Sequence, residues 1–313
     1  MNLIQRPVES DLDDLEIPGL VGALRDLRTA SQKRRYRGAP PDLPSRDATI
    51  GLVEGLAAAL YPRHFGPCGL RTRDVDAFVE RKLAETLSTL RRQVELELRL
   101  AGEKNGADHA LERHAAEIVA AFAATLPKVR AVLDTDVHAA FEGDPSAKSI
   151  DEIIFCFPGV FALIRHRLAH ELYRLGSPML ARIIAESAHS RTGIDIHPGA
   201  QIGEGFFIDH GTGVVIGETT IIGRKVRLYQ AVTLGAKRFE KDGDGALLKN
   251  YARHPIVEDN VVIYAGATVL GRITIGRGSS IGGNVWLTHS VPPGSNVTQA
   301  TAREESFHDG AGI

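Results

Sequence analysis

An aspartate and a histidine that lie 15 residues apart, Asp195 and His210, are the first candidates for chemistry in this sequence. A carboxylate beside an imidazole fixes the tautomer of the ring and stabilises its charged form, which leaves the other ring nitrogen free to act as a base. The alternative is that both side chains only bond to backbone groups at chain corners. Which applies depends on whether the chain folds back on itself at about this spacing.

Glycine recurs with a period of six through the same stretch. The positions are Gly193, Gly199, Gly205, Gly211, Gly217 and Gly223. Ile and Val follow the same period in two runs, one on each side of residues 236–254. A period of six fits neither an α-helix nor a simple strand, but it is typical of a parallel β-helix of hexapeptides. Three hexapeptides would form one triangular coil, so Asp195 and His210 are predicted to lie on neighbouring coils.

The rest of the chain predicts mostly helix. Apolar residues spaced by three to five among charged residues predict an amphipathic helix over residues 72–100, and further helices are expected over 107–133, 149–175 and 178–190. Pro127 is expected to kink or split the second of these. The predicted domains are an N-terminal extension and linker (1–70), a helical domain (71–191), a β-helix (192–295) with an extended loop over 236–254, and a flexible tail (296–313). Several prolines and glycines indicate that the linker is residues 43–69.

Composition excludes several classes of protein. The chain holds 39 acidic and 37 basic residues, so it lacks the basic excess of a nucleic-acid or membrane-surface binder. Two cysteines make no disulfide framework. The first residues lack a signal-peptide pattern, and no apolar run approaches the roughly 18 residues of a membrane span. A cytoplasmic protein is expected.

Four motifs make the sequence recognisable. They are GIDIHPGAQIG from Gly193, IDHGTGVVIGET from Ile208, VTLG from Val232 and RHPIVED from Arg253. Together they resemble the bacterial and plant serine O-acetyltransferase family over residues 144–295. The resemblance implies an α+β fold in which an N-terminal helical domain precedes a left-handed parallel β-helix of hexapeptide repeats with one extended loop. It also implies transfer of an acetyl group from acetyl-CoA to L-serine, which gives O-acetylserine for cysteine biosynthesis.

Residue roles follow from the same resemblance. It implies a general base, His210, oriented by Asp195, that takes the proton of the serine hydroxyl as the hydroxyl attacks the thioester directly in a ternary complex. No metal is needed. Two carboxylates would hold the substrate ammonium, and an arginine and a histidine would contact the substrate, the arginine at its carboxylate. These residues are Asp144, Asp209, Arg253 and His254.

The resemblance also implies partners. Acetyl-CoA would lie along the coils near Gly235, Ala265 and Gly283, where small side chains let a ligand approach the backbone. The site would lie between subunits of a homotrimer, or of a hexamer built from two trimers. L-cysteine is the expected feedback inhibitor, and Ile313 at the C-terminus would enter the active site of O-acetylserine sulfhydrylase.

Three alternatives stay open. Another hexapeptide acyltransferase would act on a sugar or on phosphoserine, and the long loop leaves the choice between serine and phosphoserine undecided. A zinc hydratase of the γ type would need three converging histidines; His210 and His254 could supply two, without a convincing third. A non-catalytic scaffold for the sulfhydrylase would not need Asp195 and His210. His166 and His170 have a zinc-compatible spacing, but packing is the favoured interpretation.

Overall fold

The computed structural model of the chain describes residues 16–36, 38–102, 108–249 and 251–299. The chain divides into two compact units, Met1–Asp42 and Leu43–Ile313. In the first unit, helix α1 (Ile17–Arg35) buries none of its side chains. The second unit contains all the predicted site residues, so this unit positions the site. Ile313 lies outside the described residues.

The second unit begins with a set of helices. They are α2 (Arg46–Leu60), α3 (Pro62–Phe65), the 3-10 helix η2 (Thr72–Asp74), α4 (Val75–Ala101), α5 (Asp108–Gly143), α6 (Ile150–Cys156), α7 (Pro158–Arg174) and α8 (Pro178–Thr192). Serine hydroxyls cap the first turns of α2 and α6, as N-cap side chains do. Proline opens α7 and α8, in the first turn where it costs no hydrogen bond.

Two expectations about the helical part were wrong, and a third was wrong in one of its two alternatives. Residues 43–69 were predicted to be a linker, but α2 lies there and buries Leu52, Val53 and Leu56 in the main core. The segment ATIGLVEGLAAAL has helical periodicity, and the prolines and glycines that indicated a linker only flank it. Pro127 was expected to kink or split its helix, and α5 continues past it to Gly143, so the helix is not split there. The helix expected over 149–175 is two helices, because Pro158 starts a new one at an angle of 74°.

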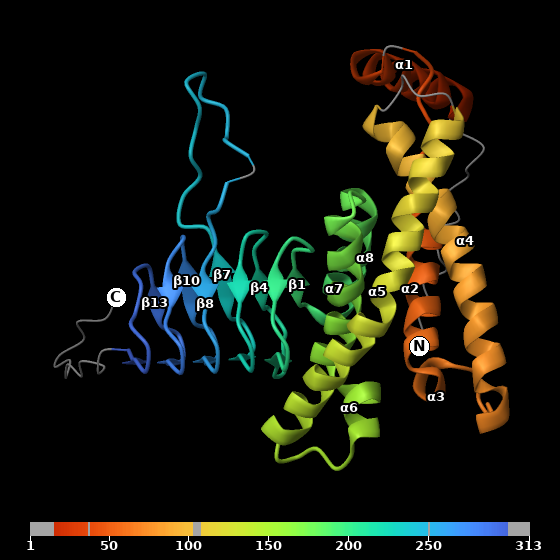
Figure 1. The fold of residues 1–313 in the computed structure, drawn as a ribbon. Coiled ribbons are helices and arrows are strands. Elements are labelled where there is room, and N and C mark those ends of the chain that lie inside the picture. The colour runs from red at the N-terminus through yellow and green to blue at the C-terminus, as the bar shows by residue number, and fades with distance from the viewer. Residues whose placement is uncertain (1–15, 37, 103–107, 250, 300–313) are drawn as a thin grey trace, which may run out of the picture. The chain divides into compact units, whose positions relative to one another are not determined.

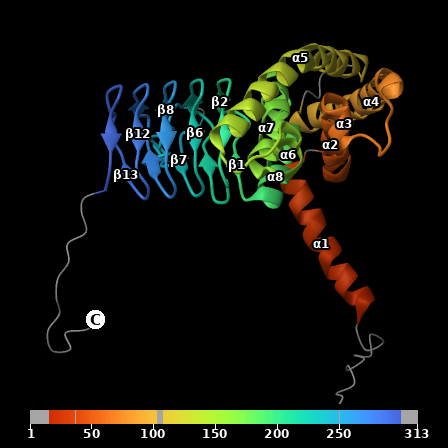
Figure 2. The same cartoon turned by 90° about the horizontal axis from the view of Figure 1, so that it is seen from below.

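After α8 the chain forms short parallel strands. They are β1 (Asp195–Ile196), β2 (Gln201–Ile202), β3 (Phe207–Ile208), β4 (Val215–Ile216), β5 (Ile221–Ile222), β6 (Arg227–Leu228), β7 (Thr233–Gly235), β8 (Ile256–Val257), β9 (Val262–Ile263), β10 (Thr268–Leu270), β11 (Thr274–Ile275), β12 (Ser280–Ile281), β13 (Trp286–Leu287) and β14 (Asn296–Val297). Figures 1 and 2 show them stacked away from α8 coil by coil.

Up to β13, every third strand joins the same sheet. Sheet A holds β1, β4, β7, β10 and β13, sheet B holds β2, β5, β8 and β11, and sheet C holds β3, β6, β9, β12 and β14. The second residue of most strands points inward and is buried, as Ile216 and Val257 are. This is the arrangement of a left-handed parallel β-helix of hexapeptide repeats, so the predicted fold class is confirmed. Between β7 and β8 the chain leaves the coils in the expected loop (Figure 1).

Strand register locates the irregular corners. Asp195 pairs with Val215, twenty residues later, whereas Val215 pairs with Thr233, eighteen residues later. The two extra residues of the first coil lie in segment 209–214, which links β3 to β4. We call this position, between sheets C and A, the C–A corner, and the position between sheets A and B the A–B corner. The DHGTG motif therefore forms an enlarged C–A corner.

A buried ion pair joins the helices to the first coil. Asp136 of α5 accepts hydrogen bonds from Arg167 of α7 at 3.0 and 3.1 Å, and from the backbone N–H of Phe206 at 2.9 Å. Arg167 also donates to the carbonyls of Ile202 and Gly203 in the β-helix. Burial raises the pKa of Asp136 to about 6, although Arg167 acts in the opposite direction. The pair therefore fixes where α5 ends relative to the β-helix.

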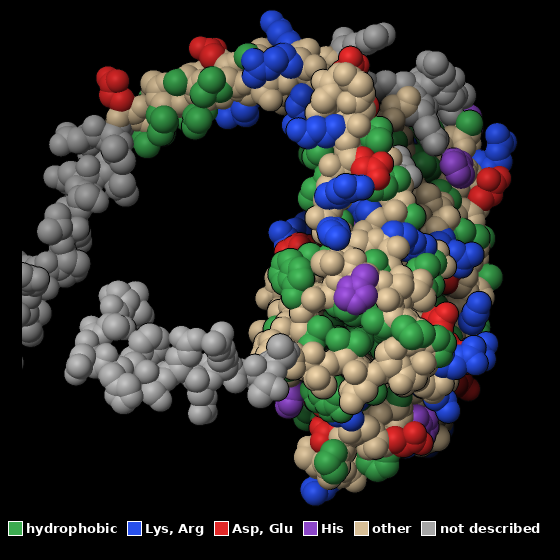
Figure 3. Space-filling view, turned by 90° about the vertical axis from the view of Figure 1, so that its left-hand side faces the viewer, with side chains coloured by type: hydrophobic (Ala, Val, Ile, Leu, Met, Phe, Trp, Pro, Cys, Tyr) green, Lys and Arg blue, Asp and Glu red, His purple; other side chains and the backbone are tan. Residues whose placement is uncertain are grey.

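The surface charges and the helix lengths agree with what the composition indicated. The face presented in Figure 3 carries acidic and basic side chains interspersed rather than gathered by sign. Within the described part of the chain, no single helix is long and apolar enough to cross a bilayer, although α6 and α7 would meet that test together as a bent pair.

Candidate active site

The C–A corner brings together Asp209 and His210. His210 has a φ of +59° and is followed by glycines with φ of +89° and +81° at 211 and 213. A histidine in the left-handed region is uncommon and mildly strained, and such residues gather at functional sites. The turn leaves the His210 side chain 70% exposed, with Nε2 at 3.8 Å from Oδ1 of the buried Asp209.

Asp144 joins this cluster from the helical part. It directly follows α5, and its Oδ1 accepts hydrogen bonds from the backbone N–H and the hydroxyl of Ser146 at 2.8 and 2.7 Å. These bonds lower the pKa of the Asp144 carboxyl, so it is ionised at neutral pH. Arg227 of β6 ties the two parts together, because it donates to Asp209 at 2.5 Å and to the carbonyl of Gly143 at 2.8 Å.

Asp195 lies next to the enlarged corner through its backbone. Its N–H donates to the carbonyl of Val214 at 2.9 Å, which places β1 against the end of the DHGTG segment. In the described residues, however, no hydrogen bond or ion pair joins Asp195 to His210, and the carboxylate nearest the His210 ring is that of Asp209. The Asp195–His210 dyad stays a prediction.

Arg253 and His254 belong to the A–B corner instead. Arg253 forms an ion pair with Glu218 at 2.6 Å. The other oxygen of Glu218 accepts a hydrogen bond from the Tyr173 hydroxyl of α7 at 2.9 Å. The hydroxyl of Thr219 accepts the backbone N–H groups of Arg253 and His254 at 3.0 and 3.2 Å. The end of the long loop is thereby fixed to the preceding coil.

The tautomer of His254 follows from its contacts. Its Nδ1 accepts the backbone N–H of Thr219 at 3.1 Å, so in the neutral ring the proton is on Nε2. Burial, followed by the positive charge of Arg253, lowers the pKa of His254 to about 4. The ring packs on Gly217, where a Cβ would come within 2.0 Å of it. His254 is therefore a neutral hydrogen-bond donor at physiological pH.

Lowered histidine pKa values predict a loss of stability in mild acid. Burial lowers the pKa of four histidines, to about 4 for two of them; the four are His166, His170, His197 and His254. Below pH 6.5 the unfolded chain binds protons that the folded chain resists, so these groups destabilise the fold progressively as pH falls from 6.5 towards 4. Asp136 and Glu97, whose pKa values burial raises, act in the opposite direction but are two groups against four.

We expect the melting temperature to be lower at pH 5 than at pH 7.5, measured by differential scanning fluorimetry at constant ionic strength. The double variant His197→Gln/His254→Asn should flatten this dependence. A melting temperature that stays level or rises between those pH values would contradict the assignment.

The three predicted acetyl-CoA contacts all border sheet A. Gly235 ends β7 and pairs with Leu270 of β10. Ala265 and Gly283 lie on successive C–A corners, where a Cβ on Gly283 would be 3.2 Å from the Ala265 carbonyl. Trp286, on the same sheet, points outward and is 70% exposed, as its position in the hexapeptide predicts.

The structure therefore divides the predicted site into two groups. Asp144, Asp209 and His210 lie at the C–A corner, whereas Arg253 and His254 lie at the A–B corner. Strand β4 runs from one corner to the other, so within one chain the two groups flank sheet A without meeting.

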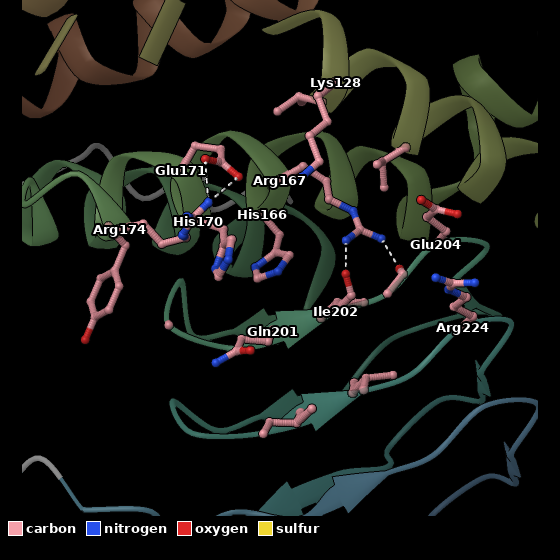
Figure 4. A pocket seen from close by; sticks show the side chains of 17 residues that line it. Lys128, His166, Arg167, His170, Glu171, Arg174, Gln201, Ile202, Glu204 and Arg224 are labelled. Carbon is pink, nitrogen blue, oxygen red and sulfur yellow. Dashed lines mark hydrogen bonds and ion pairs between the residues drawn. The ribbon is translucent and has the colours of Figure 1, made fainter. Parts of the chain in front are cut away.

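A large hollow lies elsewhere. Its volume is about 910 Å³, and it is lined by residues of α5, α7 and sheet B. Figure 4 shows His166 and His170 pointing into it beside Gln201. The two rings are 5.8 Å apart, and His170 Nδ1 donates to the carbonyl of Pro198 at 2.8 Å. Over the described residues, no cluster of three or more His, Cys, Asp or Glu suited to a metal is present.

Several residues in these clusters escaped the sequence analysis. They are Arg227, Glu218, Thr219 and Tyr173. For Arg227 a signal existed, because it lies 18 residues, about one coil, after Asp209. Tyr173 gave no such signal, since it comes from a helix 45 residues before its partner Glu218.

The chain is similar in sequence to a transferase family model and to serine acetyltransferases. Residues 254–289 match the family model described as bacterial transferase hexapeptide (six repeats). A protein of Synechococcus elongatus named "Serine acetyltransferase, plasmid" is 57% identical over 275 residues, which are 87% of this chain and 86% of that protein.

Solved structures agree with this. Serine acetyltransferase 1 of Entamoeba histolytica in complex with L-cysteine is 37% identical, with a TM-score of 0.70, over 83% of this chain and 88% of that one. Serine acetyltransferase of Neisseria gonorrhoeae in complex with serine is 27% identical, with a TM-score of 0.52, over 82% and 96%.

Proposed function

The chain belongs to the serine acetyltransferase family, and from this premise we propose how its residues transfer an acetyl group to the hydroxyl of L-serine. The observation that carries the function is 57% identity over 87% of the chain to a serine acetyltransferase. The family assignment makes the protein an acyltransferase. The residue roles, the co-substrate and the assembly that follow are proposals.

His210 is the proposed general base. The left-handed turn presents its ring to solvent beside an anionic pair, Asp209 and Asp144. The imidazole takes the proton of the serine hydroxyl while the oxygen attacks the thioester carbonyl, and the coenzyme thiolate leaves. A positioned base contributes about 10²–10⁴-fold. Because the thioester is already activated, direct attack in a ternary complex suffices, with Asp195 orienting the ring.

Substrate recognition divides between the two corners. Asp144 and Asp209 receive the ammonium of L-serine, and Arg253 pairs with its carboxylate while the Nε2–H of His254 donates a hydrogen bond. Since one chain holds these groups on opposite sides of sheet A, a complete site requires the C–A corner of one subunit to meet the A–B corner of another. This supports a homotrimer, alone or paired into a hexamer.

Acetyl-CoA is the proposed co-substrate. Gly235, Ala265 and Gly283 would let it approach the backbone along sheet A. A hollow of about 360 Å³ at the base of the long loop is lined by Lys237, Arg238 and Arg272 together with Arg253. Because cationic side chains are in excess here, this hollow suits the phosphate groups of the coenzyme.

Two further partners follow from the family. The Entamoeba enzyme binds L-cysteine, so we propose L-cysteine as a feedback inhibitor at the serine site. O-acetylserine sulfhydrylase is the proposed protein partner through Ile313. We assign the enzyme to cysteine biosynthesis in the cytoplasm, where both free cysteines, Cys68 and Cys156, would stay reduced.

A thiol-release assay tests the function. Purified protein with acetyl-CoA is offered L-serine, O-phospho-L-serine, homoserine or simple sugars in parallel. We expect L-serine to give the highest kcat/KM, because the site has cations for one carboxylate and anions for one ammonium. Failure to release thiol with L-serine, or a preference for phosphoserine, would reject the proposal.

Tyr173 is expected to affect serine binding through Glu218. Tyr173→Phe removes the hydroxyl that holds one Glu218 oxygen, so Glu218 is free to rotate and Arg253 is less well fixed. We expect the KM for L-serine to rise about threefold with kcat nearly unchanged, since a hydrogen bond to a charged group is lost at a partly exposed position. Steady-state kinetics measure this, with Tyr36→Phe as the matched control. An unchanged KM would show that Arg253 does not depend on this contact.

A further inference from the structure

Arg227 lies on the outer side of sheet C, next to the C–A corner. Its side chain is 26% exposed. The guanidinium carbon is 4.9 Å from the ring centre of Phe207 and 4.6 Å from that of Tyr229. Two aromatic rings therefore hold the planar group in one place, as cation–π contacts do.

The two amino groups of this guanidinium bond to different parts of the protein. One donates to Oδ2 of Asp209, at the beginning of the enlarged corner, at 2.5 Å. The other donates to the carbonyl of Gly143, the last residue of α5, at 2.8 Å. Asp144 follows Gly143 directly. A single side chain thus sets the position of Asp209 relative to the segment that carries Asp144.

Each of these carboxylates has one oxygen that accepts no hydrogen bond from the described residues. Arg227 occupies Oδ2 of Asp209, and Oδ1 faces His210 at 3.8 Å. Ser146 occupies Oδ1 of Asp144 twice. One oxygen of each carboxylate is then available to accept a hydrogen bond from a ligand. The charges also balance, because two carboxylates and one guanidinium leave one net negative charge for one ammonium.

We infer that Arg227 is a positioning residue that sets the spacing and the net charge of the ammonium-binding carboxylates, and so determines affinity for amino-acid acceptors. It acts through Asp209 and does not touch the substrate. This inference rests on the proposed function, in which Asp209 and Asp144 bind the ammonium of L-serine. A guanidinium is suited to the role because its fork makes two fixed bonds, whereas an ammonium on a flexible stem cannot reproduce both.

The test compares Arg227→Met and Arg227→Lys with the parent by steady-state kinetics on the intact enzyme. Arg227→Met removes both bonds, so Asp209 and the segment that carries Asp144 lose their fixed relative position. The lost cation by itself would favour the ammonium, but we expect the loss of position to dominate and the KM for L-serine to rise at least tenfold. We expect kcat to stay within threefold and the KM for acetyl-CoA within twofold, because neither depends on the ammonium subsite. Arg227→Lys keeps the charge but not the bridge, and should raise the KM for L-serine about threefold.

Arg224→Met is the matched control. Arg224 is an exposed arginine three residues earlier on the same coil, and its backbone N–H donates to Asp259 at 2.8 Å. That bond does not involve the side chain, so the substitution keeps it. This variant should leave all three constants within twofold of the parent. The melting temperature of every variant is measured alongside, so that loss of fold is seen directly.

The outcomes separate this inference from the function. A parent that does not acetylate L-serine rejects the proposed function itself. A parent that does, with a KM for L-serine unchanged or lowered in Arg227→Met, overturns the role of Arg227. If the KM values for L-serine and acetyl-CoA both rise and the melting temperature falls, the effect of the substitution is purely structural, and the role of Arg227 is also overturned. Should Arg227→Met fail to fold, an unchanged KM for L-serine in Arg227→Lys overturns the role instead.

Discussion

Replacing His210 with asparagine is expected to lower kcat for acetyl transfer by about 10²–10⁴-fold, the contribution of a positioned general base. Asparagine is preferred to alanine because position 210 has a φ of +59°, a conformation that asparagine tolerates better. The side chain is mostly exposed, so its loss should change the melting temperature little. The substitution therefore isolates the chemistry from the fold.

Thiol release with saturating L-serine and acetyl-CoA measures this effect. His289→Asn, an exposed histidine at another corner of the β-helix, is the control and should retain full activity. Asp195→Asn should lower kcat less than the His210 variant, since it removes only the orienting group. Activity of His210→Asn within tenfold of the parent would reject His210 as the base.

Replacing Asp136 with alanine is expected to cost about 3–5 kcal/mol of the free energy of unfolding. The substitution leaves Arg167 buried without its counter-ion, and an uncompensated buried charge is far more costly than a lost surface pair. It also removes the acceptor of the Phe206 N–H. Both losses fall at the joint between α5, α7 and the first coil.

Chemical denaturation of the parent and the variant measures the change. Arg174→Ala is the control on the same helix as Arg167, because it breaks an exposed pair with Glu171 and should cost less than about 1 kcal/mol. The double variant Asp136→Leu/Arg167→Met should recover part of the loss, since no charge is then left unpaired. A cost below about 1 kcal/mol for Asp136→Ala would show that the pair does not hold the joint together.

Local patterns accounted for most of the β-helix. The period of six predicted which residues point inward, and the break in period at residues 236–254 located the loop. The same logic failed for residues 43–69, where flanking prolines and glycines concealed a helix that the core requires. Motifs covered only residues 144–295, whereas the Synechococcus relative matches 275 residues.

Site prediction from the sequence had a similar limit. Motif matching selected Asp209, His210, Arg253 and His254, and the structure shows them at two corners of the β-helix. The dyad of Asp195 with His210 and the roles of the acetyl-CoA contacts stay predictions. So does the role of Ile313, which lies outside the described residues.

By itself the sequence determined the repeating fold and the residue types at its corners, because neighbours in a β-helix are set by a constant number of residues per coil. Only the tertiary structure decided which other side chains hold the corner residues in place. Arg227 reaches Gly143 across 84 residues, and Tyr173 reaches Glu218 across 45. These contacts depend on where α5 and α7 dock on the first coils, and that docking is set by packing and by the buried Asp136–Arg167 pair. No period in the sequence encodes it.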